Sequence, residues 1–424
     1  MNRAFAVILC LCLLVPAVRA AADSQPEYTY ELNDRGGVTI TGYTGTAVDL
    51  DVPTTLDGYP VTRIGAKAFS SRTVQHIAFP DSVEYIEQYA IYDCSKLKTI
   101  RIPAGTSRIE PFAVSWCAQL AKVTVAPGSA HYKDIDGVLF DITGTALLLY
   151  PQHRKGTRYT VPEGVTEIGS GAFSNNAQLE TVTLPDSLAV IGESAFSGCS
   201  ALRGVSLPAG LKSIGAYAFD VCGALTKVLI PAGVGAVGHG AFRACLKLTA
   251  IEVAEGSAAF ASRDGVLFSA DGRTLMAYPR GKAGTKYTVP KGTEIIDTEA
   301  FTGCTKLKNV ALSRGVTEIR DSAFSNCLNL EAVSLPDTLA MIGKDAFSEC
   351  RYLKKISLPA SVTSIGARAF DACASLRALT LGENVTDMGE QVFRDCRFLT
   401  VTVTPGSYAE RYCLDNRVKC WGGE

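Results

Sequence analysis

Cysteine is the residue type whose spacing first suggests chemistry in this chain. Ten cysteines recur in step with Ala-Phe or a close variant of it, each four residues after the Ala, or after Val392 in the last copy: Cys94, Cys117, Cys199, Cys222, Cys245, Cys304, Cys327, Cys350, Cys373 and Cys396. Thiolates bind zinc from closely spaced pairs such as Cys-x-x-Cys, and no such pair occurs. The other chemistry is disulfide formation, because stacked cysteines on adjacent parallel strands would come within bridging range.

The pattern of the cysteines argues against that second chemistry. They fall in blocks of two, three and five, so pairing of neighbours leaves thiols over, and the equivalent positions elsewhere hold Arg72 and Asn176. A buried position that accepts either Cys or Asn is typical of leucine-rich repeats. The column is therefore predicted to consist of buried free thiols. Cys413 and Cys420 lie outside it and are the one pair predicted to be able to form a bridge.

The residue types that support catalysis do not occur at the spacings that catalytic or metal-binding motifs require. The four histidines, His76, His131, His153 and His239, have no metal-ligand spacing. No Gly-x-Ser-x-Gly nucleophile elbow is present, and the glycine-rich stretches lack the Lys-Ser/Thr pair of a phosphate-binding loop. The sequence therefore predicts a protein that is not an enzyme and that has no cofactor and no metal.

Basic residues at the outward positions of the predicted strands are the candidate ligand-binding set. They are Lys98, Arg101, Lys122, Arg203, Lys227, Lys308, Lys354, Lys355 and Arg377, against three acidic residues, Glu180, Glu252 and Glu331. One interpretation is a solvated face whose lysines discourage association of sheet edges. The other is a surface that receives an acidic protein or glycan. The net charge of −1 favours neither nucleic acid nor an anionic membrane as partner.

A 23-residue period determines which elements position these residues. In the copy Ala195-Phe196, the segments before and after the motif alternate apolar and polar residues and predict two short strands. Gly192 is expected at a corner where a side chain would clash. Successive copies must place equivalent strands side by side and parallel, with a Phe plug in each turn and a core formed only by stacking. Twelve copies predict twelve turns of an elongated, curved solenoid that is mainly β, with short helical turns.

The period breaks twice, from Ala113 to Ala172 and from Ala241 to Ala300, and each break contains the same apolar pattern, offset by 128 residues. That pattern predicts a β-hairpin in each of two islands, at 126–162 and 254–290. The offset indicates a tandem duplication. The islands could pack back on the solenoid, or protrude and engage a ligand at two sites.

The ends of the chain differ from the repeats. Residues 1–22 have a basic start, an apolar run and small residues, and are interpreted as a cleaved export signal. Residues 23–60 are expected to form an N-terminal β cap, 61–400 the solenoid, and 401–424 a C-terminal cap with a short helix. No apolar run of 18 or more residues follows the predicted export signal, so the sequence predicts no membrane span.

The repeated units, such as LPDSLAVIGESAFSGCSALRGVSLP, resemble the BspA-like class of bacterial leucine-rich repeats from about residue 27 to 415. The island motif DGVLFSADGRTLMAYP and the closing GSYAERY also look like features of that family. The resemblance implies a secreted or surface-associated protein that acts by binding, in adhesion or host interaction, and it carries no catalytic residues. A glycan-binding protein and a structural spacer are the alternatives, and a monomer is expected.

Overall fold

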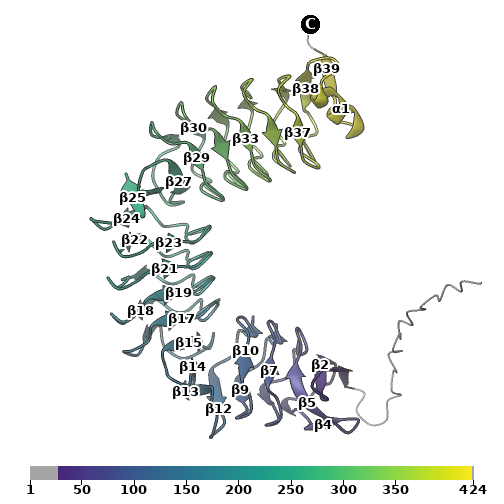
Figure 1. Ribbon diagram of the computed structural model, residues 1–424, viewed down its shortest axis with the longest axis vertical. Coiled ribbons are helices and arrows are strands. Elements are labelled where there is room, and N and C mark those ends of the chain that lie inside the picture. Colours follow the sequence, from purple (N-terminus) through teal and green to yellow (C-terminus); the bar gives the residue numbers. More distant parts are fainter. Residues whose placement is uncertain (1–26, 423–424) are drawn as a thin grey trace, which may run out of the picture.

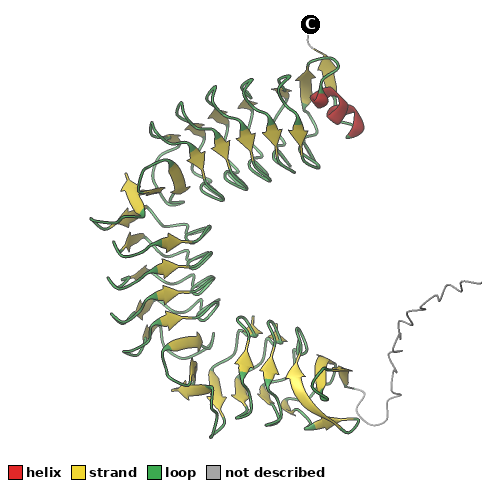
Figure 2. Ribbon diagram, in the orientation of Figure 1, coloured by secondary structure: helices red, strands yellow, loops and turns green. Residues whose placement is uncertain are grey.

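Each repeat forms one coil of two short strands joined by turns, and the coils stack into the C-shaped solenoid of Figure 1. The computed structural model describes residues 27–422, so the predicted export signal lies outside the described residues. Figure 2 shows that strands and turns make up nearly all of this part of the chain, with one helix at the C-terminal end. The predicted leucine-rich-repeat solenoid, mainly β and curved, is confirmed.

The strands that end at or near the Ile of the Ile-Gly dipeptide, and their counterparts in other coils, form the first strand column. In order they are β2 (Val38–Tyr43), β5 (Tyr59–Ile64), β7 (Tyr85–Ile86), β10 (Arg108–Ile109), β15 (Ala146–Leu149), β17 (Glu167–Ile168), β19 (Val190–Ile191), β21 (Ser213–Ile214), β23 (Ala236–Val237), β27 (Thr274–Ala277), β29 (Ile295–Ile296), β31 (Glu318–Ile319), β33 (Met341–Ile342), β35 (Ser364–Ile365) and β37 (Asp387–Met388). The column is parallel within each of three sheets, and it is interrupted between β10 and β15 and between β23 and β27.

The strands that follow the Cys-x-x-Leu segment, and their counterparts in coils without that segment, form the second strand column. They are β3 (Asp49–Asp51), β6 (His76–Ala78), β9 (Thr99–Ile102), β12 (Lys122–Val125), β16 (Arg158–Thr160), β18 (Thr181–Thr183), β20 (Gly204–Val205), β22 (Lys227–Ile230), β24 (Ala250–Val253), β28 (Lys286–Thr288), β30 (Asn309–Ala311), β32 (Ala332–Ser334), β34 (Lys355–Ile356), β36 (Ala378–Thr380), β38 (Thr400–Val403) and β39 (Cys420–Gly422). Equivalent residues pair in register, as Val310 does with Val333. The described residues make more turns than the twelve predicted, because the N-terminal strands and both islands each complete a coil.

The phenylalanines of the Ala-Phe motif form a column of stacked rings inside the coils. Phe301, Phe324, Phe347 and Phe370 are fully buried, and their ring centroids are 4.7, 5.1 and 5.3 Å apart in sequence order, in nearly parallel planes. The predicted helical turns around them are hydrogen-bonded turns rather than helices. Each ring fills the space inside one coil, so every coil depends on its two neighbours for part of its core.

The cysteine column has a specific hydrogen-bonding function. The thiol of Cys350 donates to the carbonyl of Phe324 in the preceding coil at 3.1 Å, and the thiol of Cys222 donates likewise to Phe196 at 3.2 Å. Asn176, at the equivalent position, donates its side-chain amide to the carbonyl of Tyr150 in the preceding coil at 3.4 Å, and to that of Phe173 in its own coil at 3.0 Å. The side chain at this position therefore bonds a buried carbonyl of the preceding coil. Where that carbonyl belongs to a Phe, it also accepts a backbone N–H in its own turn, as Phe324 does from the Cys327 N–H at 3.2 Å. All cysteines from Cys94 to Cys420 are free thiols, including the pair Cys413 and Cys420.

The two islands share one structure. In the first, β13 (Tyr132–Ile135), β14 (Val138–Asp141) and β15 form an antiparallel meander, and β15 then joins the parallel column through β17. In the second, β25 (Phe260–Arg263) and β26 (Val266–Ser269) repeat this arrangement with β27. Tyr150 and Tyr278 stack on the next Phe ring at 4.9 and 5.1 Å, so each island supplies its own aromatic plug.

The middle strand of each island is buried on both faces. Val138 and Phe140 pack in the core that follows the first island, whereas Leu139 packs in the core that precedes it. In the second island, Val266 and Phe268 likewise pack in the core that follows the island, and Leu267 packs in the core that precedes it. In Figure 1 the solenoid has three nearly straight segments, and the direction changes where these islands lie. The curvature is therefore concentrated at the islands.

Both described ends are covered by irregular elements. At the N-terminal end β1 (Tyr28–Leu32) pairs antiparallel with β2, and β4 (Thr55–Leu56) pairs with β5, while β8 (Ile91–Tyr92) and β11 (Val114–Ser115) form a small parallel pair in early turns. At the C-terminal end α1 (Tyr408–Asp415) begins at Ser407, whose hydroxyl accepts from the Glu410 N–H. The Tyr412 hydroxyl accepts from the Val392 N–H at 3.1 Å and donates to the Gly389 carbonyl at 3.0 Å, which joins the helix to the last coil.

Candidate functional site

The nine basic residues predicted from the sequence are all exposed, and each lies in or just before a strand of the second column. They do not form one stripe. Each straight segment of the solenoid carries its own group: Lys98, Arg101 and Lys122 in the first, Arg203 and Lys227 in the second, and Lys308, Lys354, Lys355 and Arg377 in the third. The islands separate the three groups, so the structure divides the predicted surface.

Acidic neighbours neutralise a third of these charges. Lys308 Nζ lies 3.2 Å from Glu331 Oε1, Arg203 Nε lies 3.5 Å from Glu180 Oε2, and Arg101 Nη1 lies 3.9 Å from Asp81 Oδ1. The other six have no ion pair within residues 27–422. The densest unneutralised cluster is Lys354, Lys355 and Arg377, on two successive coils, where the Arg377 guanidinium lies over the exposed Phe398 ring at 5.4 Å from its centroid.

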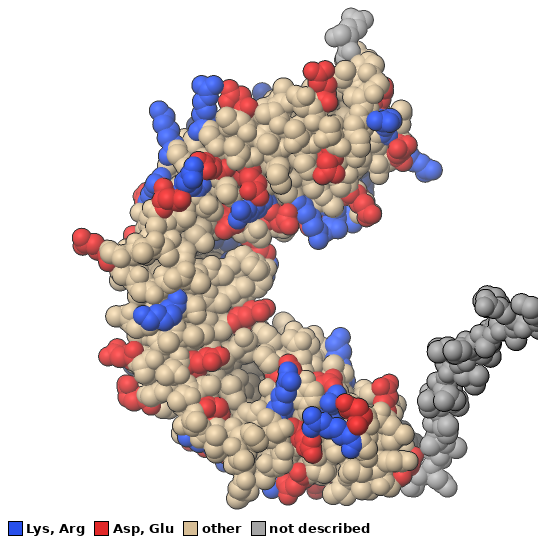
Figure 3. Space-filling model, in the orientation of Figure 1, with Lys and Arg blue, Asp and Glu red and all other residues tan. Residues whose placement is uncertain are grey.

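Figure 3 shows acidic and basic side chains intermingled over both arms of the face in view, without one sign dominating. Many of the pairs join residues 23 positions apart, such as Asp345 with Arg368 at 2.8 Å and Asp297 with Arg320 at 2.9 Å. These pairs link successive coils. The signal for them is readable in the sequence as opposite charges one period apart, and the sequence analysis missed it.

A cavity lies beside each island, where the first strand column is interrupted. The first has a volume of about 150 Å³ and is lined by apolar residues that include Ile109, Leu139 and Leu148. The second has about 40 Å³ and is lined by Val237, Leu267 and Met276, each 128 residues further along the chain, together with His239, Arg243, Arg280 and Glu299. The two islands thus carry equivalent gaps. Glu110 and Glu167 line the first, and only the second is also lined by arginines, Arg243 and Arg280.

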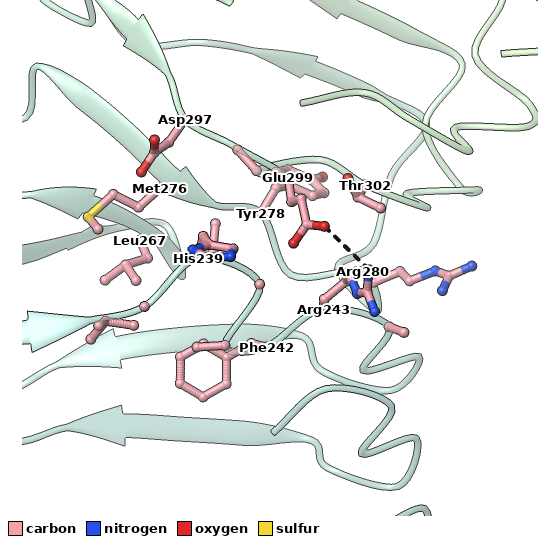
Figure 4. A pocket seen from close by; sticks show the side chains of 17 residues that line it. His239, Phe242, Arg243, Leu267, Met276, Tyr278, Arg280, Asp297, Glu299 and Thr302 are labelled. Carbon is pink, nitrogen blue, oxygen red and sulfur yellow. Dashed lines mark hydrogen bonds and ion pairs between the residues drawn. The ribbon is translucent and has the colours of Figure 1, made fainter. Parts of the chain in front are cut away.

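The charged cluster at the second gap is shown in Figure 4. Arg243 makes two bonds to Asp220 in the preceding coil, from Nε to Oδ1 at 3.1 Å and from Nη2 to Oδ2 at 2.8 Å. Its Nη1 also lies 3.3 Å from Glu299 Oε1, in the coil beyond the island. The guanidinium stacks over Tyr217, 4.9 Å from the ring centroid. This cluster links the coils on the two sides of the island.

The electrostatics of the cluster fit a structural role. The hydrogen bond to Asp220 raises the pKa of Arg243 above its ordinary value, and burial together with the nearby Glu299 raises the pKa of the Tyr217 hydroxyl. Glu299 Oε2 and Arg280 Nε are buried without a hydrogen-bond partner in the described part of the chain. A volume of 40 Å³ accommodates about one water molecule rather than a substrate.

The described residues contain no group of three or more His, Cys, Asp or Glu side chains that could hold a metal ion. The histidines are dispersed: His76 lies in β6 and hydrogen bonds to Thr99, whereas His239 lies near Tyr217 at the second gap. Among residues 27–422, none of the helices is long and apolar enough to cross a membrane.

Comparison with known proteins gives one family and several solved structures. The family model described as a BspA type leucine-rich-repeat region, in six copies, matches residues 57–143, 152–263 and 280–400. These ranges cover more than half of the chain. A search of curated proteins found no match.

Among solved structures, a leucine-rich cell surface protein from Faecalibacterium prausnitzii is 27% identical, with a TM-score of 0.53, and the match covers 96% of this chain and 99% of that one. The pneumococcal vaccine antigen PcpA is 21% identical, with a TM-score of 0.48 and coverage of 95% and 98%. A leucine-rich-repeat protein from Bacteroides ovatus is 24% identical, with a TM-score of 0.41 and coverage of 95% and 100%.

Proposed function

Because the chain belongs to the BspA-type leucine-rich-repeat family, we propose that it is an exported, non-enzymatic binding module that receives an acidic protein surface on its exposed basic groups. Proteins of this family act through their repeat surfaces and are found at cell surfaces. The F. prausnitzii protein, similar over 96% of this chain, is described as a cell surface protein. These relations support export and binding rather than catalysis.

The observation that carries the proposal is the unneutralised cluster of Lys354, Lys355 and Arg377. Lys354 and Lys355 are neighbours in the chain, and Arg377 lies one 23-residue period after Lys354 on the next coil. Stacking of the coils therefore places the three cations on the same face, although β34 and β36 do not pair. Arg377 is stacked on an exposed aromatic ring, an arrangement that gives a partner both charge and apolar contact. The many weak contacts of such a surface confer specificity and fast association.

The test begins with binding of the protein to an array of immobilised extracellular proteins, sulfated and carboxylated polysaccharides, and neutral glycans. The triple variant Lys354→Glu, Lys355→Glu, Arg377→Glu is expected to bind each captured acidic protein at least about tenfold more weakly, with a slower association rate. A matched control replaces Lys212, Lys291 and Lys344 by Glu; these lysines are exposed and lie outside the basic groups. The control is expected to stay within about twofold of the parent protein.

Three outcomes would count against the proposal. Equal affinity of both triple variants for every acidic protein would remove the basic groups as the binding surface. Binding to polysaccharides alone would favour the glycan-binding alternative. Self-association in sedimentation experiments, without any captured partner, would favour a structural spacer.

A further inference from the structure

An open cavity lies at the C-terminal end of the described chain, outside the three basic groups. It is a groove of about 470 Å³ between the turn of the last coil and the segment that joins α1 to β39. Pockets of roughly 300 to 1,000 Å³ accommodate small organic ligands, so this groove has room for two to three sugar units. The elements beside this groove, α1 and β39, lie at the top of Figure 1.

The groove is lined mainly by cations. Arg394 and Arg397 come from the last coil, and Arg417 and Lys419 come from the segment after α1, whereas Asp395 is the one acidic residue that lines it. Arg394 is neutralised by Asp371 at 2.5 Å. Arg397, Arg417 and Lys419 have no ion pair within residues 27–422. Three positive charges therefore face one cavity with only Asp395 against them.

The backbone explains why these cations converge. Asn416 ends α1, and Arg417 adopts the left-handed conformation, with φ of 55°. The Val418 N–H then donates to the Cys413 carbonyl at 2.8 Å, which reverses the chain toward β38. The Val401 N–H donates to the Lys419 carbonyl at 2.9 Å, so Lys419 is held beside the last full coil.

The walls of the groove are held in place before any ligand arrives. Phe393, Leu399 and Tyr412, which form its buried lining, are 6, 5 and 9% exposed. The two hydrogen bonds of the Tyr412 hydroxyl to the last coil fix the distance between the two walls. A preorganised site loses less free energy to ordering when it binds.

We propose that this groove binds a compact polyanionic saccharide, one that carries sulfate or carboxylate groups on two to three sugar units, through Arg397, Arg417 and Lys419. Arginine presents a planar set of donors that matches sulfate and carboxylate oxygens, and lysine adds a point charge. The apolar lining supplies contact for the sugar faces. The inference goes beyond the proposed function, since none of its residues belongs to the three basic groups.

Calorimetric titration of the protein with sucrose octasulfate, a digalacturonate, inorganic sulfate and sucrose tests the proposal. Sucrose octasulfate is expected to bind at one site, more weakly as salt is raised, and sucrose is expected not to bind. The digalacturonate tests carboxylate as the anion, and inorganic sulfate tests whether one anion suffices. The variant Arg397→Gln, Arg417→Gln, Lys419→Gln is expected to lose at least tenfold in affinity for sucrose octasulfate.

The matched control removes three exposed cations that lie outside both the groove and the three basic groups, by Arg411→Gln, Lys291→Gln and Lys344→Gln. It is expected to bind sucrose octasulfate within about twofold of the parent protein. Equal affinity of the groove variant and the control, or equal binding of sucrose, would overturn the proposal. Loss of sucrose octasulfate binding in the variant Lys354→Glu, Lys355→Glu, Arg377→Glu, with binding kept in the groove variant, would favour that basic group instead.

The half-buried thiol of Cys396, which also lines the groove, provides a second readout that does not require the variants to fold. The rate at which each reagent modifies Cys396 is divided by the rate of the same reagent on a free model thiol. In the parent protein, this relative rate is expected to be higher for the dianionic disulfide reagent DTNB than for neutral iodoacetamide. Sucrose octasulfate is expected to slow only the DTNB reaction by several-fold, as measured by peptide mass spectrometry. Modification at unchanged rates in saturating sucrose octasulfate would contradict the proposed site.

Discussion

At the scale of single residues, the tightest constraints lie in the turn around each Phe. The residue before the Cys, or before Asn176, adopts a left-handed conformation in eleven coils, and six of them place Gly, Asn or Asp there: Asp93, Asn175, Gly198, Gly303, Asn326 and Asp395. Val221 occupies the same position with φ of 57°, although a β-branched side chain is disfavoured in that region. The left-handed conformation costs a residue with a Cβ roughly 1–2 kcal/mol.

Replacing Val221 by Asn is therefore expected to raise the free energy of unfolding by about 1 kcal/mol. Val221 is 45% exposed, so little buried contact is lost. Urea unfolding followed by circular dichroism measures the change. Val221→Thr keeps the branched shape but removes the exposed apolar group, and an equal gain in that variant would show that surface polarity, rather than backbone strain, is the cause.

The glycine of the Ile-Gly dipeptide is required by close approach of the coils. At Gly192 a Cβ would lie 2.7 Å from the Ser170 backbone nitrogen, and at Gly366 it would lie 2.4 Å from that of Lys344. Neither residue has a positive φ. The predicted clash is thus with the preceding coil, rather than within a sharp corner of the same coil.

Gly366→Ala is expected to destabilise the protein by about 1–3 kcal/mol, because the neighbouring backbone must move. Gly204 in β20 has no heavy atom within 4 Å of the corresponding Cβ position. Gly204→Ala is therefore expected to be neutral or to stabilise by about 0.5–1 kcal/mol. Differential scanning calorimetry of both variants measures this, and similar losses in the two would contradict the role of coil spacing.

At the scale of elements, the cysteine column makes stability depend on alkaline pH. Burial raises the pKa of Cys199, Cys245 and Cys327 to about 12 from the ordinary value of 9.0. The folded state therefore keeps these protons after the unfolded chain has released them. Their contribution to stability is complete below pH 9 and is lost as the pH rises from 9 toward 12.

By pH 10 each such thiol is expected to have reduced the free energy of unfolding by about 1 kcal/mol. Urea unfolding under reducing conditions at pH 7, 8, 9 and 10 measures the slope. The tyrosines of the unfolded chain are mostly protonated up to pH 9 and about half ionised at pH 10, so the thiol contribution is taken from the comparison with a Cys variant. Cys199→Ala is expected to be less stable at pH 7 and to show a shallower decline above pH 9. A midpoint that does not change up to pH 10 would contradict the burial of the column.

At the scale of the whole molecule, the islands divide the core. The three hydrophobic clusters meet at the islands, in β14 and β15 and in β26 and β27, whose side chains are shared between different clusters. Solenoids unfold in units set by the coupling between neighbouring repeats. The Arg243 to Glu299 ion pair adds coupling at the second island, and the equivalent positions at the first, Ser115 and Gly171, have no such pair.

Removal of one stacked Phe ring is therefore expected to destabilise the straight segment that contains it more than the other two segments. Phe347→Ala should cost about 3–5 kcal/mol, since the ring is fully buried between Phe324 and Phe370. Native-state hydrogen exchange read by mass spectrometry is expected to show lost protection across residues 266–413 and little change in 38–139. A uniform loss along the chain would show a single cooperative unit.

The sequence by itself determined the coil, because period, strand pattern and plug all recur at one spacing and stacking is the one way to bury them. It also determined the exchange of Cys and Asn at one buried position, since both are donors small enough for the same carbonyl. The tertiary structure alone decided the division of the basic residues into three groups, the bends at the islands, and the C-terminal groove. Each of these depends on how side chains far apart in the chain meet across an interrupted or terminated stack, and no local pattern encodes that meeting.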